Sequence, residues 1–435
     1  MRPKLCCLIL PLFFVLFISS SVLTFGIDIP QDSKDCIECH TKEKVARATI
    51  DEWMQSRHSL NSVGCYDCHR AVATDPDAVS HYGKYISVIV SPKDCGGCHQ
   101  REAAEFGNSH HAKGADILGS LDNLLGESIE GIAAVNSGCK QCHGSEVKVL
   151  EGGRLDPATW PNTGIGRINP DGSRGSCSAC HSRHSFSVEI ARRPDNCGKC
   201  HLGPDHPQKE IYDESKHGIA FYANEDRMNL KAQPWVLTKD YSAAPTCATC
   251  HMSATPDLPV SHDIGMRISW TLRPEVSKKL DNWEVRRGNM KKVCGECHSP
   301  KYVDGFYTQF DEVVNLYNNK FAVPAKSIME KLRESKKLTP TQFDEKLEWT
   351  YYLLWHHEGR RARHGAAMMG PDYTQWHGFF EVAERFYTEF IPEAEALLPG
   401  VTKDVMNMDV NAWKKGVSKE ERDKIKKYYQ DRYGQ

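Results

Sequence analysis

One short pattern, Cys-x-x-Cys-His, recurs eight times in these 435 residues and limits what the chain can fold into more than any other feature. We number the copies as motifs one to eight in chain order. They are Cys36, Cys39 and His40; Cys65, Cys68 and His69; Cys95, Cys98 and His99; Cys139, Cys142 and His143; Cys177, Cys180 and His181; Cys197, Cys200 and His201; Cys247, Cys250 and His251; and Cys294, Cys297 and His298. The motifs use 16 of the 18 cysteines, and the other two lie in an apolar N-terminal segment.

This spacing is the attachment motif for c-type haem. Two thiols at this separation can form thioether bonds to the two vinyl groups of one haem, and the adjacent imidazole can bind the iron. Zinc ribbons and disulfides are the alternatives, but a zinc site gives no reason for a histidine after every second cysteine. Eight copies without exception therefore predict eight covalently bound haems c.

Residues 1–26 are typical of an export signal, because Arg2 and Lys4 precede a long apolar run that ends in small and polar residues. An uncleaved membrane anchor is the alternative, since the run is almost long enough to span a bilayer. Haem c is attached on the outer side of the bacterial inner membrane, which favours export. No second long apolar stretch follows. We therefore expect a soluble periplasmic protein with no stable membrane span after cleavage.

Charge and composition exclude one class of partner. The chain has 55 Lys+Arg against 57 Asp+Glu, for a net charge of −2. Nucleic-acid binding requires a basic excess, so the sequence predicts no nucleic-acid partner.

The chain divides into a haem-binding domain, residues 27–300, and a C-terminal helical domain, residues 301–435. Between the motifs Gly, Pro, Asp and Ser are frequent, as in residues 164–172, and strand-like alternation is scarce. Because so little apolar sequence separates the motifs, we expect the haems to replace much of the usual side-chain core. The sequence predicts a mainly α fold with a loop-rich haem-binding region, a C-terminal bundle of long helices and very little β structure.

Three or four long helices are expected in the C-terminal domain. Residues 308–335 have helical periodicity. Thr339 is the predicted N-cap of the next helix, with Pro340 in its first turn and an end near residue 369. Asp372 is the predicted cap of a third helix, and residues 419–429 form the last.

The remaining histidines decide between an electron carrier and an enzyme. Of 20 histidines, 12 lie outside the motifs. A haem with two axial imidazoles carries electrons, whereas one with an open position can bind a small nitrogen or oxygen species. Seven distal positions can be filled, although any single one of these residues could instead be a surface histidine. The candidate distal ligands are His58, His81, His110 or His111, His184, His217, His262, and His356 or His357.

The chain resembles the hydroxylamine oxidoreductase family of octahaem cytochromes c. The resemblance rests on Cys197-Gly-Lys-Cys-His-Leu-Gly-Pro-Asp-His-Pro-Gln208 and on residues 214–220, 261–270 and 355–378, and it extends from about Cys36 to Pro392. In that family the fourth motif carries the catalytic haem, whose open side is lined by an Asp-His pair. Asp205-His206 is the only such dipeptide here and stands in the matching motif.

An Asp-His pair suits the chemistry that the resemblance implies. Hydroxylamine or hydrazine must lose protons as it loses electrons, and an imidazole beside a carboxylate can accept and relay them. The alternative is a loop turn in which His206 is one more axial ligand. The matching motif favours the catalytic role for Asp205 and His206.

Two tyrosines are further candidates. In oxidative members of the family, a tyrosine of a neighbouring subunit is bonded covalently to the catalytic porphyrin and creates the chromophore called P460. Members that lack it resemble reductases of nitrite or hydroxylamine. Tyr373 is the candidate for this bond, and Tyr302 for a further active-site tyrosine; a buried aromatic is the alternative for both. A bond between subunits implies a homotrimer.

The Arg360, Arg361 and Arg363 run has two interpretations, a solvated helix face or partners for haem propionates. Three functional classes also stay open. The first is oxidation of hydroxylamine or hydrazine, with electrons passing through bis-His haems to a soluble c-type cytochrome. The second is the reverse reaction on nitrite or hydroxylamine, and the third is a non-enzymatic electron conduit.

Overall fold

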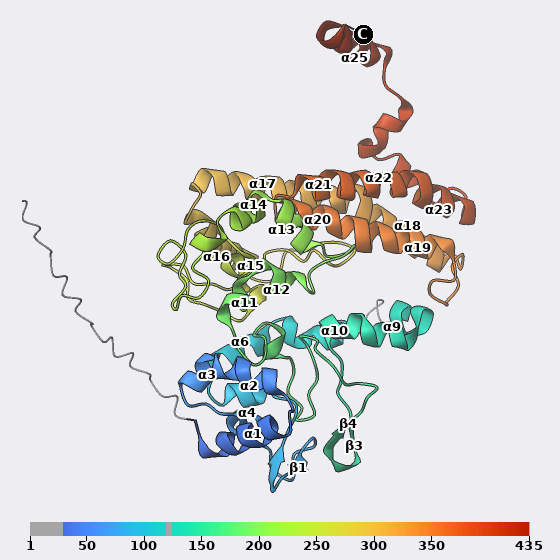
Figure 1. Ribbon diagram of the computed structural model, residues 1–435. Helices are drawn as coiled ribbons and strands as arrows, with labels where there is room; N and C mark the ends of the chain where they lie inside the picture. The colour runs from blue at the N-terminus through green and yellow to red at the C-terminus, as the bar shows by residue number, and fades with distance from the viewer. Residues whose placement is uncertain (1–28, 119–123, 435) are drawn as a thin grey trace, which may run out of the picture.

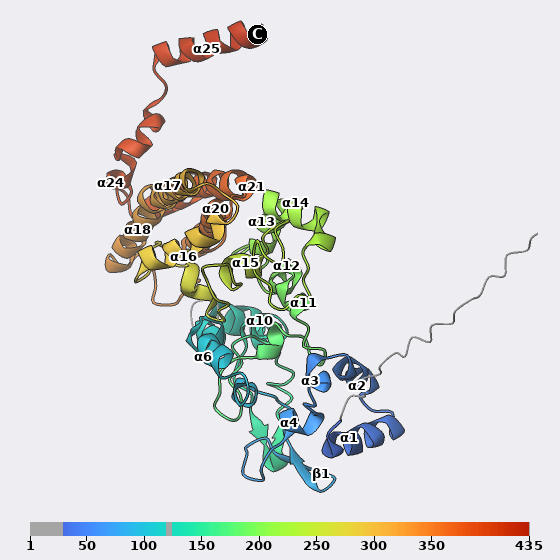
Figure 2. The same cartoon turned by 90° about the vertical axis from the view of Figure 1, so that its left-hand side faces the viewer.

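The computed structural model describes residues 29–118 and 124–434, so the predicted signal segment 1–26 lies outside the described residues. The chain forms two halves that differ in the length of their helices and in the amount of loop (Figures 1 and 2). Short helices and long loops make up the part that contains the motifs, and long helices make up the part that follows motif eight. No helix among the described residues is both long and apolar enough to cross a membrane.

The first half contains many short helices. Those before motif five are α1 (Gln31–Lys42), α2 (Arg47–Met54), α3 (Arg57–Leu60), α4 (Cys65–His69), α5 (Pro92–Gly96), α6 (Gln100–Asn108), α7 (Gly114–Ile117), α9 (Ile132–Ser137) and α10 (Cys139–His143). Those from motif five to motif eight are α11 (Val188–Arg192), α12 (Pro194–Gly198), α13 (Gln208–Glu214), α14 (Lys216–Ala223), α15 (Cys247–His251) and α16 (Trp283–Gly295).

Strands are few, as the sequence predicts. Strand β1 (Val79–His81) pairs antiparallel with β2 (Lys84–Ile86), and β3 (Val149–Leu150) pairs antiparallel with β4 (Arg154–Leu155). The described residues are therefore mainly helical, and the prediction of a mainly α fold is confirmed.

Several motifs form single helical turns. Helices α4, α10 and α15 each span one whole motif, from the first cysteine to the histidine. Residues three and four apart lie on the same face of a helix, so both thiols and the imidazole point to one side. In α15 the turn is fixed by a capping box, in which Thr246 accepts a hydrogen bond from the Thr249 N–H.

Long, nearly continuous helices form the second half. The first joins α17 (Pro300–Tyr317) and α18 (Val323–Glu334) through a π-helical turn, η7 (Asn318–Ala322). The second joins α19 (Lys346–Tyr352), η8 (Leu353–Glu358) and α20 (Gly359–Ala367). The third runs from α21 (Pro371–Thr374) through η9 (Gln375–Phe380), α22 (Glu381–Arg385) and η10 (Phe386–Phe390) to α23 (Ile391–Leu397).

These helices enclose the largest apolar cluster of the described residues. Phe321, Phe386 and Phe390 are at its centre, with ring centroids 5.4 Å apart for the first pair and 5.8 Å for the second. Two glycines let the second and third helices touch. A Cβ on Gly365 would lie 2.5 Å from the Thr374 nitrogen, and one on Gly378 would lie 2.7 Å from the Ala362 Cα. Larger side chains would separate α20 from η9.

Two predicted helix starts are wrong. The second helix begins at Lys346, with Glu345 at the N-cap, instead of at Pro340 with Thr339 at the N-cap, because the Thr339 hydroxyl accepts a hydrogen bond from the Thr341 N–H and forms a local turn. Phe343 then has a φ of 64°, which a helix does not tolerate. In the third helix Gly370 holds the N-cap position, and Asp372 lies in the first turn.

The chain ends in a separate arm. After α24 (Lys403–Met406), helix α25 (Lys419–Tyr433) projects away from the rest of the molecule in both views (Figures 1 and 2). It extends four residues beyond the predicted end at Tyr429.

Candidate haem-binding site

A single cavity of about 3070 Å³ runs through the part of the molecule that holds the motifs. All eight motif histidines line it, together with most of the motif cysteines. Motifs far apart in the sequence therefore face one continuous space, of the size that several haems would need.

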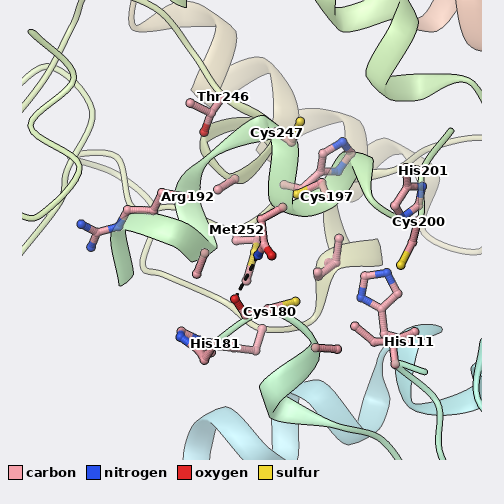
Figure 3. Close-up of a pocket in the computed structure, with 18 of the residues that line it drawn as sticks. His111, Cys180, His181, Arg192, Cys197, Cys200, His201, Thr246, Cys247 and Met252 are labelled. Carbon is pink, nitrogen blue, oxygen red and sulfur yellow. Dashed lines mark hydrogen bonds between the residues drawn. The ribbon is translucent and has the colours of Figure 1, made fainter. Parts of the chain in front are cut away.

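Contacts between motif cysteines give the order of the motifs in space. Thiols lie close enough to interact between motifs one and two, two and three, three and five, five and six, six and seven, and seven and eight. Motif four joins at motif six, where the Cys142 thiol contacts Cys200 and lies 3.9 Å from the Lys199 carbonyl oxygen. Figure 3 shows Cys180 and His181 of motif five beside Cys197 and Cys200 of motif six. The motifs thus form a chain with motif four as a branch at motif six.

Six motif histidines face a second imidazole across the cavity. The separations between ring centroids are 6.1 Å for His40–His81, 6.2 Å for His99–His58, 6.3 Å for His69–His184, 6.4 Å for His181–His262, and 6.0 Å for both His201–His111 and His298–His217. Two imidazole nitrogens that are each about 2 Å from one metal ion hold their ring centroids roughly 6 Å apart. The donor set and its spacing therefore fit bis-His haems.

Burial keeps several of the cavity imidazoles in the form that binds iron. Desolvation lowers the pKa of His111, His181 and His251 to about 4 and that of His201 to about 3. A neutral imidazole is the metal-ligating form, so the rings are ready to coordinate at neutral pH.

Six of the predicted distal positions belong to these pairs, and the seventh does not. For the choice between His110 and His111, the ring opposite His201 is that of His111 (Figure 3). His356 and His357 lie on η8 and are not among the residues that line the cavity. They lie instead near Asp205, and the negative charge of that carboxylate acts to raise the pKa of His357.

Asp205 and His206 lie where motifs four and six meet. His206 Nε2 donates a hydrogen bond to the Cys200 carbonyl oxygen over 2.9 Å, and its Nδ1 contacts the Asp205 carboxylate. The other carboxylate oxygen accepts a hydrogen bond from Arg360 Nη1 over 3.0 Å. Burial alone would raise the pKa of Asp205, but the contacts with His206 and the charges of His356 and Arg360 outweigh it and hold that pKa below its usual range. The carboxylate is thus ionised and fixed from two sides.

Glycines allow neighbouring backbone segments to pack closely against the motif-four segment. A Cβ on Gly114 would lie 2.7 Å from the His143 carbonyl oxygen, and one on Gly164 would lie 2.0 Å from the Gly144 nitrogen. Backbone hydrogen bonds from Ile165 N–H to the Cys142 oxygen and from Gly166 N–H to the His143 oxygen close the contact. The region around residues 164–172, predicted to be a loop, therefore has a defined position against motif four.

The three arginines of the run do not share one environment, so neither of the two predicted interpretations describes all of them. Arg360 is bonded to Asp205, Arg361 contacts Glu381, and Arg363 is fully buried and donates to the Ser277 hydroxyl over 2.6 Å. The solvated-face interpretation is wrong for Arg360 and Arg363, because both are buried in the seam between the two halves. Of the three, Arg360 lines the cavity.

The sequence analysis missed His364. This imidazole is wholly buried, lines the cavity, and has no hydrogen-bond partner for its Nδ1. Arg273, Arg360 and His206 lie close enough to lower its pKa further below the value that burial gives. The sequence feature that could have identified His364 is its position four residues after Arg360 on one helix, which puts both side chains on the same face.

The two predicted tyrosines have different environments. Tyr302 is stacked on His298 of motif eight, with ring centroids 4.9 Å apart, and its hydroxyl lies 3.9 Å from the Met369 sulfur. The structure therefore does not bring Tyr302 to Asp205 and His206. Tyr373 is half-buried on α21 and is not among the residues that line the cavity, although its neighbour Thr374 is.

Comparisons with known proteins agree with this geometry. A family model described as "Seven times multi-haem cytochrome CxxCH" matches residues 166–345, and one described as "Cytochrome c554 and c-prime" matches residues 20–70. A probable nitrite reductase-hydroxylamine oxidoreductase fusion protein of Kuenenia stuttgartiensis is 24% identical in an alignment of 339 residues, and the match covers 64% of this chain and 35% of that protein. This chain thus spans about a third of the length of that relative.

Two solved structures share the fold. A hypothetical multiheme protein has a TM-score of 0.73 at 24% identity, over 85% of this chain and 95% of that one. A reducing HAO-like protein complex of Kuenenia stuttgartiensis has a TM-score of 0.63 at 19% identity, over 86% of this chain and 87% of that one. These similarities extend over both halves of the molecule.

Proposed function

We propose that this multihaem cytochrome c oxidises hydroxylamine at the haem of motif four and passes the electrons through the other haems to a soluble c-type cytochrome. The observation that carries the proposal is the position of Asp205 and His206 against Cys142 and Cys200, where motif four branches from the chain of motifs. A haem with an open axial position would supply the site that binds the substrate nitrogen and accepts its electrons.

The residues of this chain would handle the protons. Hydroxylamine loses as many protons as electrons on its way to nitric oxide, so each electron transfer needs a nearby proton acceptor. His206 has Asp205 on one nitrogen and the Cys200 carbonyl oxygen on the other. Both neighbours are acceptors, which suits the ring after it has taken a proton. Arg360 holds the Asp205 carboxylate in place from the opposite side.

The six imidazole pairs support an electron path. In a bis-His haem both axial positions are filled, so the haem carries electrons and has no place for substrate. The pairs belong to motifs one, two, three, five, six and eight, which are neighbours in space. Electrons from motif four would enter at motif six and leave along either arm of the chain. Each motif would carry one haem c, giving eight.

Tyr373 supports the proposal of a P460-type haem in a homotrimer. Tyr373 is not among the residues that line the cavity of its own chain, as expected for a residue that acts on a neighbouring subunit. Two further aromatic side chains on the same helix, Trp376 and Phe380, are 60% and 48% exposed with ring centroids 5.5 Å apart. These exposed rings are available for a contact with a neighbouring subunit. The trimer would form after export to the periplasm.

A second candidate is the reverse reaction, reduction of nitrite or hydroxylamine. It is favoured by the cationic groups around the same site, since Arg273 and Arg360 both line the cavity near His206 and His364. Cations attract an anion such as nitrite, whereas neutral hydroxylamine does not require them. One of the structural relatives is also described as reducing. Hydrazine oxidation to dinitrogen is a variant of the first candidate at the same site.

One set of measurements tests these candidates. The purified holoprotein is given hydroxylamine, hydrazine or reduced dye plus nitrite, and the redox state of an added cytochrome c or dye is followed. Hydroxylamine-dependent reduction of the cytochrome, a P460-type absorption band and a motif-four haem peptide with Tyr373 attached support oxidation. An uncrosslinked peptide together with nitrite-dependent dye oxidation would replace it with the reductive function. If neither reaction occurs and carbon monoxide binds to no haem, the protein is an electron conduit.

A further inference from the structure

We propose that the adjacent histidines His110 and His111 bind two different haem irons, His111 opposite His201 of motif six and His110 opposite His251 of motif seven. This inference rests on the haem complement proposed above, but not on the substrate or the direction of the reaction.

The first step concerns His111. Its ring centroid lies 6.0 Å from that of His201, within the range of the other pairs, with the ring planes tilted by 57°, and Figure 3 shows the two residues near each other. His110 has helical backbone angles, with φ −62° and ψ −22°. Successive side chains on a helical turn point about 100° apart, so His110 cannot reach the iron that His111 binds. If His110 is a ligand, it must serve another haem.

The second step places motif seven beside motif six. The Cys197 thiol of motif six contacts the Cys247 thiol of motif seven, and Figure 3 shows these two cysteines next to each other. His251 also lies near enough to His111 to affect it electrostatically. A haem at motif seven is therefore the neighbour that a ligand beside His111 would meet.

The third step connects His110 to His251 through one short segment, η6 (Ile264–Arg267). The Ile264 backbone contacts the His251 ring. In the same segment, the Cβ position of Gly265 lies 3.7 Å from the His110 ring carbon Cδ2. The rings of His110 and His251 thus border the same turn of chain, and both line the cavity.

The other two imidazoles that could serve motif seven fit less well. Both nitrogens of His206 are engaged, by Asp205 and by the Cys200 carbonyl oxygen. The charged groups that act most strongly on His364 are Arg273, Arg363, Arg360 and His206. His364 belongs to the surroundings of Asp205 and His206, so His110 is the ligand that remains for motif seven.

The consequence is that one short segment, residues 110–114, contacts three motifs. Residues 110–111 would hold irons at motifs six and seven, and Gly114, three residues later, packs on the His143 carbonyl of motif four. Electrons that leave motif four would therefore meet two acceptors whose ligands share one turn of backbone. Any change in that turn would alter both arms of the electron path.

The test counts altered haems in the oxidised holoprotein, without substrate. Methionine in place of an axial histidine leaves a low-spin haem with a raised reduction potential and a sulfur-to-iron absorption band. His110→Met and His111→Met should each convert one haem per chain, and the double variant should convert two. His377→Met is the matched control, because His377 is exposed and lies outside the cavity; it should convert none. The proposal is overturned if His110→Met converts none while His364→Met converts one.

A second set of variants, made in a protein that lacks the haem of motif seven, identifies the iron that His110 binds. Cys247→Ser with Cys250→Ser removes the haem of motif seven, and mass spectrometry verifies a loss of one haem. In this background His110→Met should convert no remaining haem, while His111→Met should still convert one. Conversion of a haem by His110→Met would assign it to another motif and overturn the proposal. If this background does not mature, His251→Lys keeps the attachment cysteines, and adding His110→Met must then shift only the haem already altered.

Discussion

The two halves of this molecule have interiors of different composition. The helical half packs side chains against one another, and Leu332, Val382, Phe386 and Phe390 are all fully buried in its cluster. The first 180 or so described residues contribute only Leu125 to the three apolar clusters. In their place is a cavity lined by thiols and imidazoles. The comparison shows that a chain can omit an apolar core where covalently attached groups occupy the interior.

The largest test of this comparison is to withhold the haems. Expressed without haem attachment, residues 29–118 and 124–211 should lose protection from hydrogen exchange, because they contribute only Leu125 to the apolar clusters. The helices within residues 300–397 should remain protected, because their core consists of side chains. Hydrogen exchange read by mass spectrometry gives both results in one sample. Equal protection in the two halves would contradict the comparison.

The second test is at the seam between the halves, where Asp205 of one meets Arg360 of the other. Asp205→Asn should lower kcat roughly 100-fold or more, the usual scale for loss of a proton-transfer group, while the bis-His haem spectrum stays unchanged. Asp213→Asn is the matched control, since Asp213 pairs with Lys209 and does not line the cavity. Similar kcat values for the two variants would remove Asp205 from the mechanism.

The third test is confined to the helical half. Leu332→Ala should lower the free energy of unfolding by about 2–5 kcal/mol, because it empties a fully buried position. Leu316→Ala, at a side chain that is 45% exposed, should change it by less than about 0.5 kcal/mol. Denaturant unfolding followed by circular dichroism gives both values. Haem spectra should be the same in both variants, and a change in them would show that the halves are not independent.

The smallest expected effect is a pH dependence in the same half. Burial raises the pKa of Glu358 to about 7, against the opposing charge of Arg385, which it meets at 2.5 Å. A carboxyl whose pKa is raised by folding stabilises the folded state at low pH and loses that contribution as pH rises through the folded value. Between about pH 5 and about pH 8 the loss should be roughly 2 kcal/mol. Unfolding of Glu358→Gln should lack this slope, and an unchanged slope would assign it elsewhere.

Prediction from the sequence succeeded where the signal is local. The motif spacing predicts a thiol pair and an imidazole on one helical face, and α4, α10 and α15 have that form. Helical periodicity gave the long helices, although side-chain hydrogen bonds in the Thr339 turn moved one start by six residues. The predicted seventh distal position, His356 or His357, is not among the residues that line the cavity, because whether a helix residue faces the cavity depends on how that helix packs.

The sequence by itself determined the chemistry of this protein, since a Cys-x-x-Cys-His motif carries its attachment groups and its first iron ligand within five residues. The tertiary structure alone decided which imidazole stands opposite each of six motif histidines and which motif is the branch. Those partners are up to 115 residues apart, as in His69 and His184. Their pairing depends on the path of the loops between motifs, and no local pattern of residues records that path.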